Sequence, residues 1–574
     1  MPIKRDDATT DTYDESNSVT GCSSSYPIGR LTRIVESGVT TVYCYDAWGR
    51  VIQKQKLTTT TGYSYTAAGR LSGIVYADGS LVSYVRDGDG RIQSISATPP
   101  NGTATTVVSG VTYQPFGPVS GYTLGNGQSI TRSYDANYRL TDLTSPAFSL
   151  HVARDTMGDI TGIGNAAGAN PATETYSYDP LYRLTAVTEA DGSVLESVTY
   201  NPTGDRLSKT GSGLYTGAYG YNPNTHQLVS VGNSALTVDA NGNTTAISAA
   251  GSVYGFGYNN RNRLTVAQLG GSTLANYTYD ALGRRIQKIA NGQTESYVYD
   301  EAGQLLAESG ATNRDYIWMD GIPVANIDTS SGSSTMTYVT ADQLGTPRVI
   351  ANANGNTLWQ LPYQGNPWAE QSPVSNGYTY NLRFAGQYYD QETGISYNIN
   401  RDYDPSTGRA PQSDPIGPAG GWSTYAYALN NPLNYTDPLG LHFIIASGGT
   451  LTLYNDDLSV AGTYTYSSGM HGNTDYTSSG LGPTPPGVYM INPAELSPAG
   501  LFRKYLDPRD WGDYRVPLHP GANTETYGRA GFFLHGGWLR HGSEGCLKVE
   551  GPSQDQLFDQ IKHDTAPIPV WVHY

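Results

Sequence analysis

Two residues near the end of the chain have the types and spacing of a nucleophilic site. Cys546 follows His535 by eleven residues, within the stretch FFLHGGWLRHGSEGCLKV. An imidazole beside a thiol lowers the pKa of that thiol, and the same imidazole can later protonate a leaving amine. Backbone N–H groups around Gly545 and Cys546 can stabilise an oxyanion, because glycine permits close approach. The spacing predicts a cysteine enzyme in which His535 is the general base.

Short β-strands are expected to position this pair. Residues 530–535 form an apolar segment that predicts a strand ending at the histidine, and a loop would then present the cysteine. Further elements are expected as a hairpin of residues 450–455 and 458–466, a turn and strand at 482–491, and a helix at 553–564. The sequence therefore predicts a small, mainly β catalytic domain over residues 442–574.

The His-Gly and Ser-Glu-Gly-Cys elements of this stretch resemble the signature of the L,D-transpeptidase family. Pro485 to Tyr489, with the sequence PPGVY, is similar to a second element of that family. The short spacing between His535 and Cys546 fits best a branch that serves as antibacterial effectors of type VI secretion. The resemblance implies that Cys546 is the nucleophile, that His535 is the base and that no metal or other cofactor takes part.

Four neighbours of the pair are further candidates. The resemblance implies that Ser543 and Gly545 shape the loop beside the nucleophile. His541 is a candidate partner of the site or of a substrate carboxylate, and Arg540 a candidate partner of a stem-peptide carboxylate. For His541 and Arg540, an ordinary solvent-facing loop residue is an equally good interpretation.

The same resemblance implies a substrate and a place of action. The substrate would be the tetrapeptide stem of peptidoglycan, from which Cys546 would expel the terminal D-Ala to leave a thioester. Water would then give carboxypeptidase activity, and an amine acceptor would give transpeptidation. Such an enzyme would be made in the cytoplasm, exported by a specialised secretion apparatus, and active in the periplasm of a target bacterium. A cognate immunity protein would block it.

Two alternatives remain open for this domain. One is a cysteine peptidase or amidase of another specificity, although papain-like and NlpC-type enzymes place the cysteine before the histidine in sequence. The other is a non-catalytic module that binds the cell wall or mediates adhesion, in which Cys546 is an inert buried thiol.

An array of Tyr-Asp repeats precedes the domain. Segments of this kind begin at Tyr45, Tyr65, Tyr134, Tyr178, Tyr200, Tyr258, Tyr279 and Tyr299. A typical unit has an alternating apolar stretch before Asp-x-x-Gly-Arg and another after it, which predicts strand, turn and strand. One hairpin cannot bury its own face, so stacked hairpins are expected to form a long coiled sheet.

These units resemble the YD repeats of the rearrangement-hotspot (Rhs) family and of toxin-complex C subunits. The resemblance implies a β-shell that wraps a C-terminal cargo, with residues 1–339 as the shell and residues 340–441 as the core segment that ends it. It also implies an N-terminal adaptor or a partner chain that completes the shell.

Residues 340–441 are similar to the segment that ends such shells, and their last five residues are Asp-Pro-Leu-Gly-Leu. The resemblance implies that the chain cuts itself between Leu441 and His442. Two close carboxylates can supply a base and an acid, because their pKa values split. The resemblance selects Asp414 and Asp437 as this pair, with Arg401 to orient a carboxylate or steady the oxyanion.

Charge and composition restrict the remaining classes. The net charge is −16, and residues 442–574 hold 13 acidic and 8 basic side chains, which disfavours a nucleic-acid partner. No apolar run is long enough to span a membrane, and the first residues lack the apolar core of an ordinary secretory signal. Cys22, Cys44 and Cys546 are too few for a disulfide framework, and Cys22 and Cys44 are expected to have no special role.

Overall fold

The computed structural model describes residues 3–437 and ten short segments of the C-terminal region. Within the first part it leaves out residues 7–8, 37, 116–117, 137, 169–171, 212–214, 250, 302, 311–312 and 415–422. The described C-terminal segments are residues 444–447, 450–454, 460–467, 487–491, 497–498, 514–520, 533–537, 547–550, 557–558 and 568–573.

Asp46 shows how one repeat unit makes a turn. Its carboxylate accepts a hydrogen bond from the backbone N–H of Arg50 at 3.0 Å and pairs with Nε of the same arginine at 2.6 Å. Between them Gly49 has φ +87°, a left-handed conformation that strains any residue with a Cβ. The hydroxyl of Tyr45 donates to the carbonyl of Leu31 in the preceding unit at 2.6 Å. The aspartate therefore closes its own turn, and the tyrosine ties its unit to the one before.

The tyrosine hydrogen bond recurs along the array. It joins Tyr65 to Val51, Tyr134 to Val119, Tyr178 to Ile160, Tyr200 to Leu184, Tyr258 to Thr244 and Tyr279 to Leu264. The strand register also shifts at the tyrosine, as between Cys44 and Tyr45 of one unit. This repeated bulge adds twist at each turn and curves the sheet.

The hairpins join into one 35-stranded antiparallel sheet in which consecutive strands pair. A short helix, α1 (Asn17–Thr20), lies between its second and third strands. The strands of this sheet are β1(Ile3–Asp6), β2(Thr9–Tyr13), β3(Leu31–Glu36), β4(Val39–Tyr45), β5(Val51–Lys56), β6(Thr59–Tyr65), β7(Leu71–Val75), β8(Leu81–Arg86), β9(Ile92–Thr98), β10(Thr105–Tyr113), β11(Val119–Leu124), β12(Ser129–Tyr134), β13(Leu140–Thr144), β14(Leu150–Arg154), β15(Ile160–Gly164), β16(Glu174–Tyr178), β17(Leu184–Glu189), β18(Val194–Tyr200), β19(Arg206–Gly211), β20(Gly217–Tyr221), β21(Leu228–Val231), β22(Ser234–Val238), β23(Thr244–Ala249), β24(Ser252–Tyr258), β25(Leu264–Leu269), β26(Ser272–Tyr279), β27(Arg285–Ala290), β28(Gln293–Tyr299), β29(Leu305–Ser309), β30(Arg314–Met319), β31(Ile322–Ser330), β32(Ser333–Ala341), β33(Pro347–Ala351), β34(Thr357–Gln360) and β35(Val374–Ser375).

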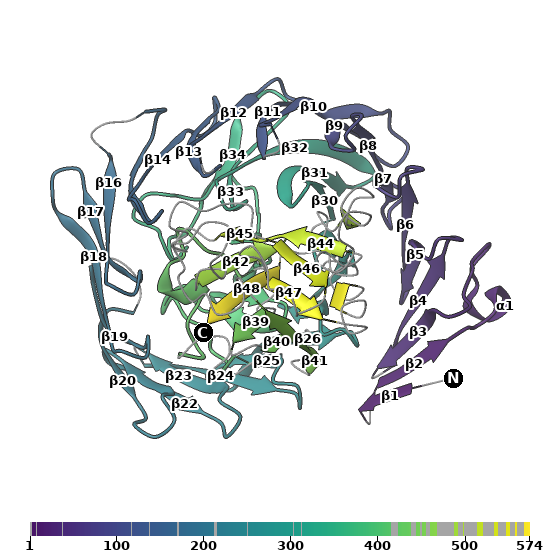
Figure 1. Ribbon diagram of the computed structural model, residues 1–574. Helices are drawn as coiled ribbons and strands as arrows, with labels where there is room; N and C mark the ends of the chain where they lie inside the picture. Colours follow the sequence, from purple (N-terminus) through teal and green to yellow (C-terminus); the bar gives the residue numbers. More distant parts are fainter. Residues whose placement is uncertain are drawn as a thin grey trace.

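The sheet curls around an interior (Figure 1). Side chains from distant strands meet across a seam, where the curled sheet closes. Lys54 of β5 donates from Nζ to the carbonyl of Tyr299 at 2.6 Å and pairs with Glu301 at 2.5 Å. The hydroxyl of Tyr76 donates to the carbonyl of Tyr316 in β30 at 2.7 Å. These pairs join β5 and the end of β7 to strands more than 200 positions later in the chain, so the curled sheet is held closed by buried polar contacts.

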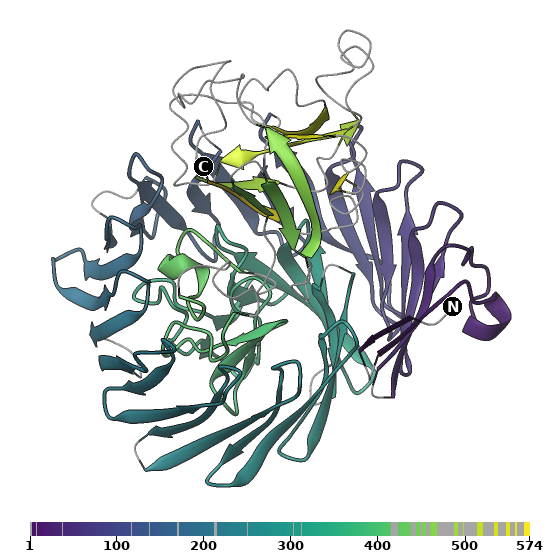
Figure 2. The same ribbon diagram turned by 60° about the horizontal axis from the view of Figure 1, so that its bottom comes forward.

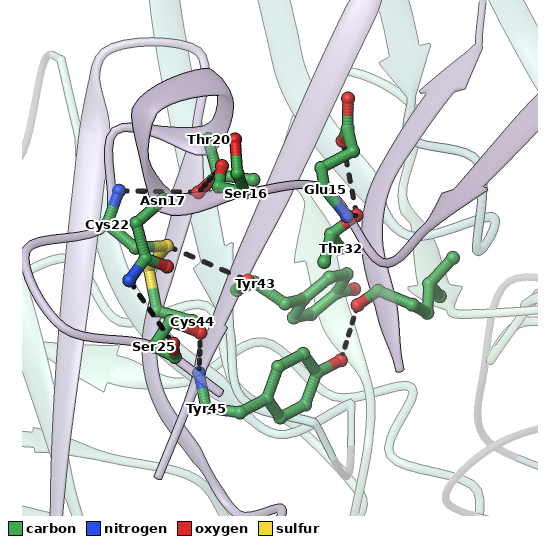
Figure 3. Close-up of a disulfide and its surroundings, with 11 residues drawn as sticks. Glu15, Ser16, Asn17, Thr20, Cys22, Ser25, Thr32, Tyr43, Cys44 and Tyr45 are labelled. Atoms are coloured by element: carbon green, nitrogen blue, oxygen red, sulfur yellow. Dashed lines mark hydrogen bonds between the residues drawn. A yellow bond between two sulfur atoms is a disulfide. The ribbon is translucent and has the colours of Figure 1, made fainter. Parts of the chain in front are cut away.

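A disulfide joins Cys22 to Cys44 near the N-terminal edge of the sheet (Figure 3). Both cysteines are buried, and the bond ties the loop after α1 to strand β4. The expectation that these two cysteines have no special role is therefore wrong. The pairing could not be predicted from the sequence, because the two residues meet only once β3 and β4 have formed the hairpin between them.

A segment inside the curled sheet follows β35. It contains the three-stranded sheet β36(Tyr388–Asp390), β37(Ile395–Asn398) and β38(Arg401–Tyr403), and a left-handed turn, η2(Ala428–Asn430). Its buried side chains pack on the sheet, as Tyr388 does against Tyr297 with ring centroids 5.0 Å apart. The boundary expected at residues 339 and 340 lies within β32, and the large sheet continues to β35.

The C-terminal region forms a separate ten-stranded sheet, which lies within the ring in Figure 1 and toward one open end of it in Figure 2. Its order is β43-β44-β46-β47-β41-β40-β39-β48-β42-β45. The strands are β39(Ile444–Ser447), β40(Thr450–Tyr454), β41(Val460–Ser467), β42(Gly487–Ile491), β43(Ser497–Pro498), β44(Tyr514–Pro517), β45(His519–Pro520), β46(Phe533–Gly537), β47(Leu547–Glu550) and β48(Ile568–His573).

The mainly β class predicted for the whole chain is confirmed, as is the hairpin now seen as β40 and β41. The strand predicted to end at His535 continues to Gly537 instead, because Gly536 and Gly537 pair with β47. Of the predicted helix at residues 553–564, the structure describes Leu557 and Phe558, which are helical and buried.

Candidate functional site

Arg401 lies at the start of β38, inside the curled sheet. Strand β38 pairs with β37, and Arg401 stands opposite Asn398 across a tight turn. Arg401 and Tyr403 project from the same face of the strand because they are two residues apart. Tyr403 belongs to a buried cluster with Ala369, Phe384 and Tyr427. The arginine is therefore held at the edge of a rigid aromatic core and is itself only 7% exposed.

The guanidinium of Arg401 bridges the two carboxylates that the sequence had selected. Its Nη1 lies 2.7 Å from Oδ2 of Asp414, and its Nη2 lies 2.6 Å from Oδ2 of Asp437. Burial alone would lower the pKa of Arg401, but the two carboxylates outweigh burial and raise it. The arginine thus stays charged and lowers the electrostatic cost of holding two acids together.

Different elements hold the two aspartates. The backbone N–H of Asp414 donates to the carbonyl of Thr424 at 2.6 Å, so the segment with Asp414 runs beside residues 423–426. The carbonyl of Asp437 accepts a hydrogen bond from Nδ2 of Asn398 at 2.8 Å. Asn398 is buried and belongs to β37, so the main chain at Asp437 is fixed to the same small sheet as Arg401.

The described part of the chain breaks off after Asp437, four residues before the expected cut. The two residues that flank the expected cut, Leu441 and His442, lie outside the described residues. The site combines two acids and a fixed cation, and one of the acids, Asp437, lies four residues before the expected cut in sequence. Such a set can activate water, donate a proton to a leaving amine and stabilise an oxyanion.

Asp402, which follows Arg401 in β38, is a buried acid with a shifted pKa that the sequence reasoning missed. It is buried, its backbone N–H donates to Oε1 of Gln412 at 2.9 Å, and Nε2 of Gln412 donates to its carboxylate at 2.5 Å. Burial raises the pKa of Asp402 to about 7, against the opposing effect of Gln412. Its position next to Arg401 was a visible signal, but the raised pKa depends on surroundings that only the fold supplies.

The candidate catalytic pair of the C-terminal region is described in part. His535 lies in β46, which pairs in parallel with β47 so that Leu534 stands opposite Leu547 and His535 opposite Lys548. Leu534 and Leu547 are both buried. Cys546 directly precedes Leu547 in sequence. The strand that carries His535 and the strand that begins directly after Cys546 therefore lie side by side.

Five of the predicted residues of this pair's neighbourhood lie outside the described residues: Arg540, His541, Ser543, Gly545 and Cys546. For His535 the structure describes the backbone position alone.

Within the described ranges, no group of three or more His, Cys, Asp or Glu side chains is placed to hold a metal ion. Among the helices of that same part of the chain, none has the length and apolar character needed to cross a bilayer.

A curled sheet of paired hairpins, with a buried segment inside and a separate β-domain after it, defines a YD-type β-shell protein. The family model of the Teneurin YD-shell matches residues 122–414, and that of the RHS repeat matches residues 45–81. The chain belongs to this Rhs and YD-shell family. The model of the L,D-transpeptidase catalytic domain (YkuD) matches residues 441–572, so the chain carries a YkuD-like domain behind its shell.

Known relatives and structures agree on the shell. The probable deoxyribonuclease RhsA of Dickeya dadantii is 33% identical over 198 residues, which cover 33% of this chain and 14% of that protein. The toxin protein Tse5 of Pseudomonas aeruginosa is 40% identical over 112 residues, which cover 19% of this chain and 8% of that protein. A crystal structure of TcdB2–TccC3–Cdc42 matches with a TM-score of 0.63 at 18% identity, over 76% of this chain and 25% of the other. The chain thus spans about a seventh of the length of RhsA.

Proposed function

We propose that this chain is a polymorphic antibacterial toxin whose shell encloses and releases a cell-wall enzyme. The shell, formed by the Tyr-Asp hairpins, would hold residues 442–574 until the chain cuts itself after Leu441. The released domain would be a cysteine L,D-carboxypeptidase or transpeptidase that acts on peptidoglycan tetrapeptide stems. It would be exported from the producing cell, act in the periplasm of a target bacterium and be matched by an immunity protein.

The observation that carries the enzyme proposal is the parallel pairing of β46 and β47. It brings the backbone of His535 to the strand that begins one residue after Cys546. A neutral imidazole beside a thiol can take its proton, and the thiolate then attacks the carbonyl of the third stem residue. The terminal D-Ala leaves as an amine that accepts the proton, and a thioester to Cys546 remains. Water or an acceptor amine then resolves the thioester.

The observation that supports self-cleavage is the double ion pair of Arg401. Of the two carboxylates it bridges, Asp437 lies four residues before the expected scissile bond and Asp414 lies far from it in sequence. In the proposed step one acid accepts a proton from water, the other protonates the leaving nitrogen of His442, and Arg401 steadies the oxyanion. Hydrolysis yields a new carboxylate on Leu441 and a new amine on His442.

The experiment is to direct the full chain to the periplasm of a test bacterium as wild type, Cys546→Ala and His535→Ala. A matched control is His151→Ala, which removes a histidine of the shell that pairs with Asp142 of β13. Wild type and the control are expected to kill and to change the stem-peptide pattern seen by mass spectrometry, whereas the two site variants leave it unchanged. Toxicity that persists in Cys546→Ala would show a binding or adhesion module instead.

Killing with intact stems would point to another substrate. Cleavage of a protein substrate would identify a peptidase, and degradation of chromosomal DNA would match the activity in the name of RhsA. The acidic balance of residues 442–574, with 13 acidic and 8 basic side chains, favours the wall over DNA.

A further inference from the structure

Two hairpin turns of the shell end in an unusual residue. In five turns the last residue is an arginine that pairs with an aspartate at the first position, as Arg50 does with Asp46 at 2.6 Å and Arg183 with Asp179 at 2.6 Å. The turns that begin at residues 155 and 201 end instead in Asp159 and Asp205. Each of these aspartates is 1% exposed. A buried carboxylate is costly without partners, so the contacts of these two residues matter.

Asp159 holds the segment that leads to the expected cut. Its Oδ1 accepts hydrogen bonds from Nδ2 of Asn431 at 2.9 Å and from Nδ2 of Asn434 at 3.2 Å. Arg154, on β14 of the same hairpin, donates from Nη1 to Oδ1 of Asn434 at 2.8 Å. The hairpin of β14 and β15 thus binds the side chains of two asparagines that lie six and three residues before Asp437.

Asp205 holds the other side of the site. Its Oδ1 accepts a hydrogen bond from Ser423 Oγ at 2.8 Å and lies 3.3 Å from Nη2 of Arg409. Burial alone would raise the pKa of Asp205, but Arg409 and Ser423 outweigh burial and lower it. In the same turn the carbonyl of Gly204 accepts from Nδ2 of Asn430 at 3.1 Å.

The partners of Asp159 and Asp205 lie close in sequence to the two carboxylates of the candidate self-cleavage site. Arg409 and Ser423 lie on either side of Asp414, and Asn431 and Asn434 come before Asp437. An arginine at the end of either turn would place a cation where the inner segment now presents an arginine or amide donors. The change from arginine to aspartate therefore suits contact with the inner segment. Asp205 also helps to close its own turn, because Nδ2 of Asn201 donates to its Oδ2 at 3.1 Å.

We infer that Asp159 and Asp205 are positioning residues for self-cleavage, each fixing one of the two chain segments that carry the carboxylates bridged by Arg401. This inference rests on the proposed self-cleavage. It also predicts that residues up to Asp437 stay bound to the shell after the cut, whereas residues 442–574 are freed.

The test follows self-cleavage of the full chain with time in a cell-free translation, by gel and by intact mass. Asp159→Ala and Asp205→Ala are expected to slow the cut about 10- to 100-fold, because small displacements of reacting groups cost that much. Asp159→Asn keeps an acceptor oxygen for the two asparagines and is expected to restore most of the rate. Removal of the donors in the double variant Asn431→Ala with Asn434→Ala should slow the cut as Asp159→Ala does, without a further loss when the two changes are combined.

Two controls separate positioning from stability. Asp87→Ala breaks an ordinary turn pair, Asp87 with Arg91, in the hairpin of β8 and β9, and is expected to leave the rate unchanged. The rate of Asp159→Ala is expected to fall by the same factor at every pH, since no reacting group is removed. The inference is overturned if both alanine variants cut at the wild-type rate, or if Asp87→Ala slows the cut as much. A wild-type chain that stays intact would overturn the proposed self-cleavage together with this inference.

Discussion

Replacement of Arg401 by methionine is expected to slow self-cleavage strongly and to lower the stability of the chain. Loss of one partner of a buried ion pair costs about 3–5 kcal/mol, because a charge is left buried and unpaired. Here two carboxylates lose the cation that lies 2.7 and 2.6 Å away. The side chain of Asp437 is 18% exposed and keeps some contact with water, so the lower end, about 3 kcal/mol, is expected.

The effect on the reaction should be larger than the effect on the fold. Without the guanidinium, no fixed cation stabilises the oxyanion or the close pair of acids, and the cut is expected to slow about 100- to 1,000-fold. Cell-free translation with gel and mass analysis gives the rate, and tryptophan fluorescence during denaturation gives the stability. Arg401→Lys keeps a charge but cannot bridge both carboxylates in the same way, so an intermediate rate is expected.

Arg314→Met is the matched control for this prediction. Arg314 is 4% exposed and also makes two ion pairs, at 3.2 Å with Glu308 and 2.6 Å with Asp328. It lies in β30 and donates to the carbonyl of Thr379 at 2.9 Å, whereas Arg401 pairs with Asp414 and Asp437. The control is expected to lose a similar stability and to cut at the wild-type rate. The reasoning fails if Arg401→Met cuts as fast as wild type, or if the two arginine variants lose the cut alike.

Three further predictions concern the buried acid Asp402, the seam of the curled sheet and the disulfide. The pKa of Asp402 is raised to about 7, so the fold favours its protonated form, and its contribution to stability is present below about pH 4 and is lost as the pH rises toward 7. Asp402→Asn should therefore unfold at a higher temperature than wild type at pH 8 and at a similar temperature at pH 4. Equal unfolding midpoints of the two proteins at both pH values would contradict the raised pKa. Tyr76→Phe removes the hydrogen bond to the carbonyl of Tyr316 and should cost about 1–2 kcal/mol in denaturant titration, with no loss if the seam does not form in solution. The double variant Cys22→Ser with Cys44→Ser removes a disulfide between residues 22 positions apart and should lower the free energy of unfolding by about 3 kcal/mol, which is seen as faster proteolysis near α1. Proteolysis of this variant at the wild-type rate under non-reducing conditions would show that the bond does not form.

The repeating part of the fold was accessible from the sequence because its signals are local. Asp46, Gly49 and Arg50 are within five residues of one another, and their turn follows from their own backbone and side-chain preferences. The same logic covers the hairpin of β40 and β41. The bonds that close the shell were not accessible, since Lys54 and Glu301 are 247 residues apart and their contact depends on the curvature summed over many hairpins.

The residues of the candidate site also divide into those that the sequence predicts and those that only the fold reveals. Arg401, Asp414 and Asp437 were selected through a family resemblance, and the structure brings the three side chains together. The raised pKa of Asp402 arises from burial and was invisible in the sequence. The change from arginine to Asp159 and Asp205 could be seen in the repeats, but Asn431, Asn434, Ser423 and Arg409 could be recognised as partners only from the fold.

One measurement tests the central claim most directly. Purified full-length chain is incubated with an isolated peptidoglycan tetrapeptide stem, and the products are weighed by mass spectrometry. The account predicts loss of the terminal D-Ala, or its exchange for an added amine, with wild type and neither change with Cys546→Ala. A stem that stays intact with wild type after the domain has been freed, or one that is trimmed equally by both proteins, would contradict it.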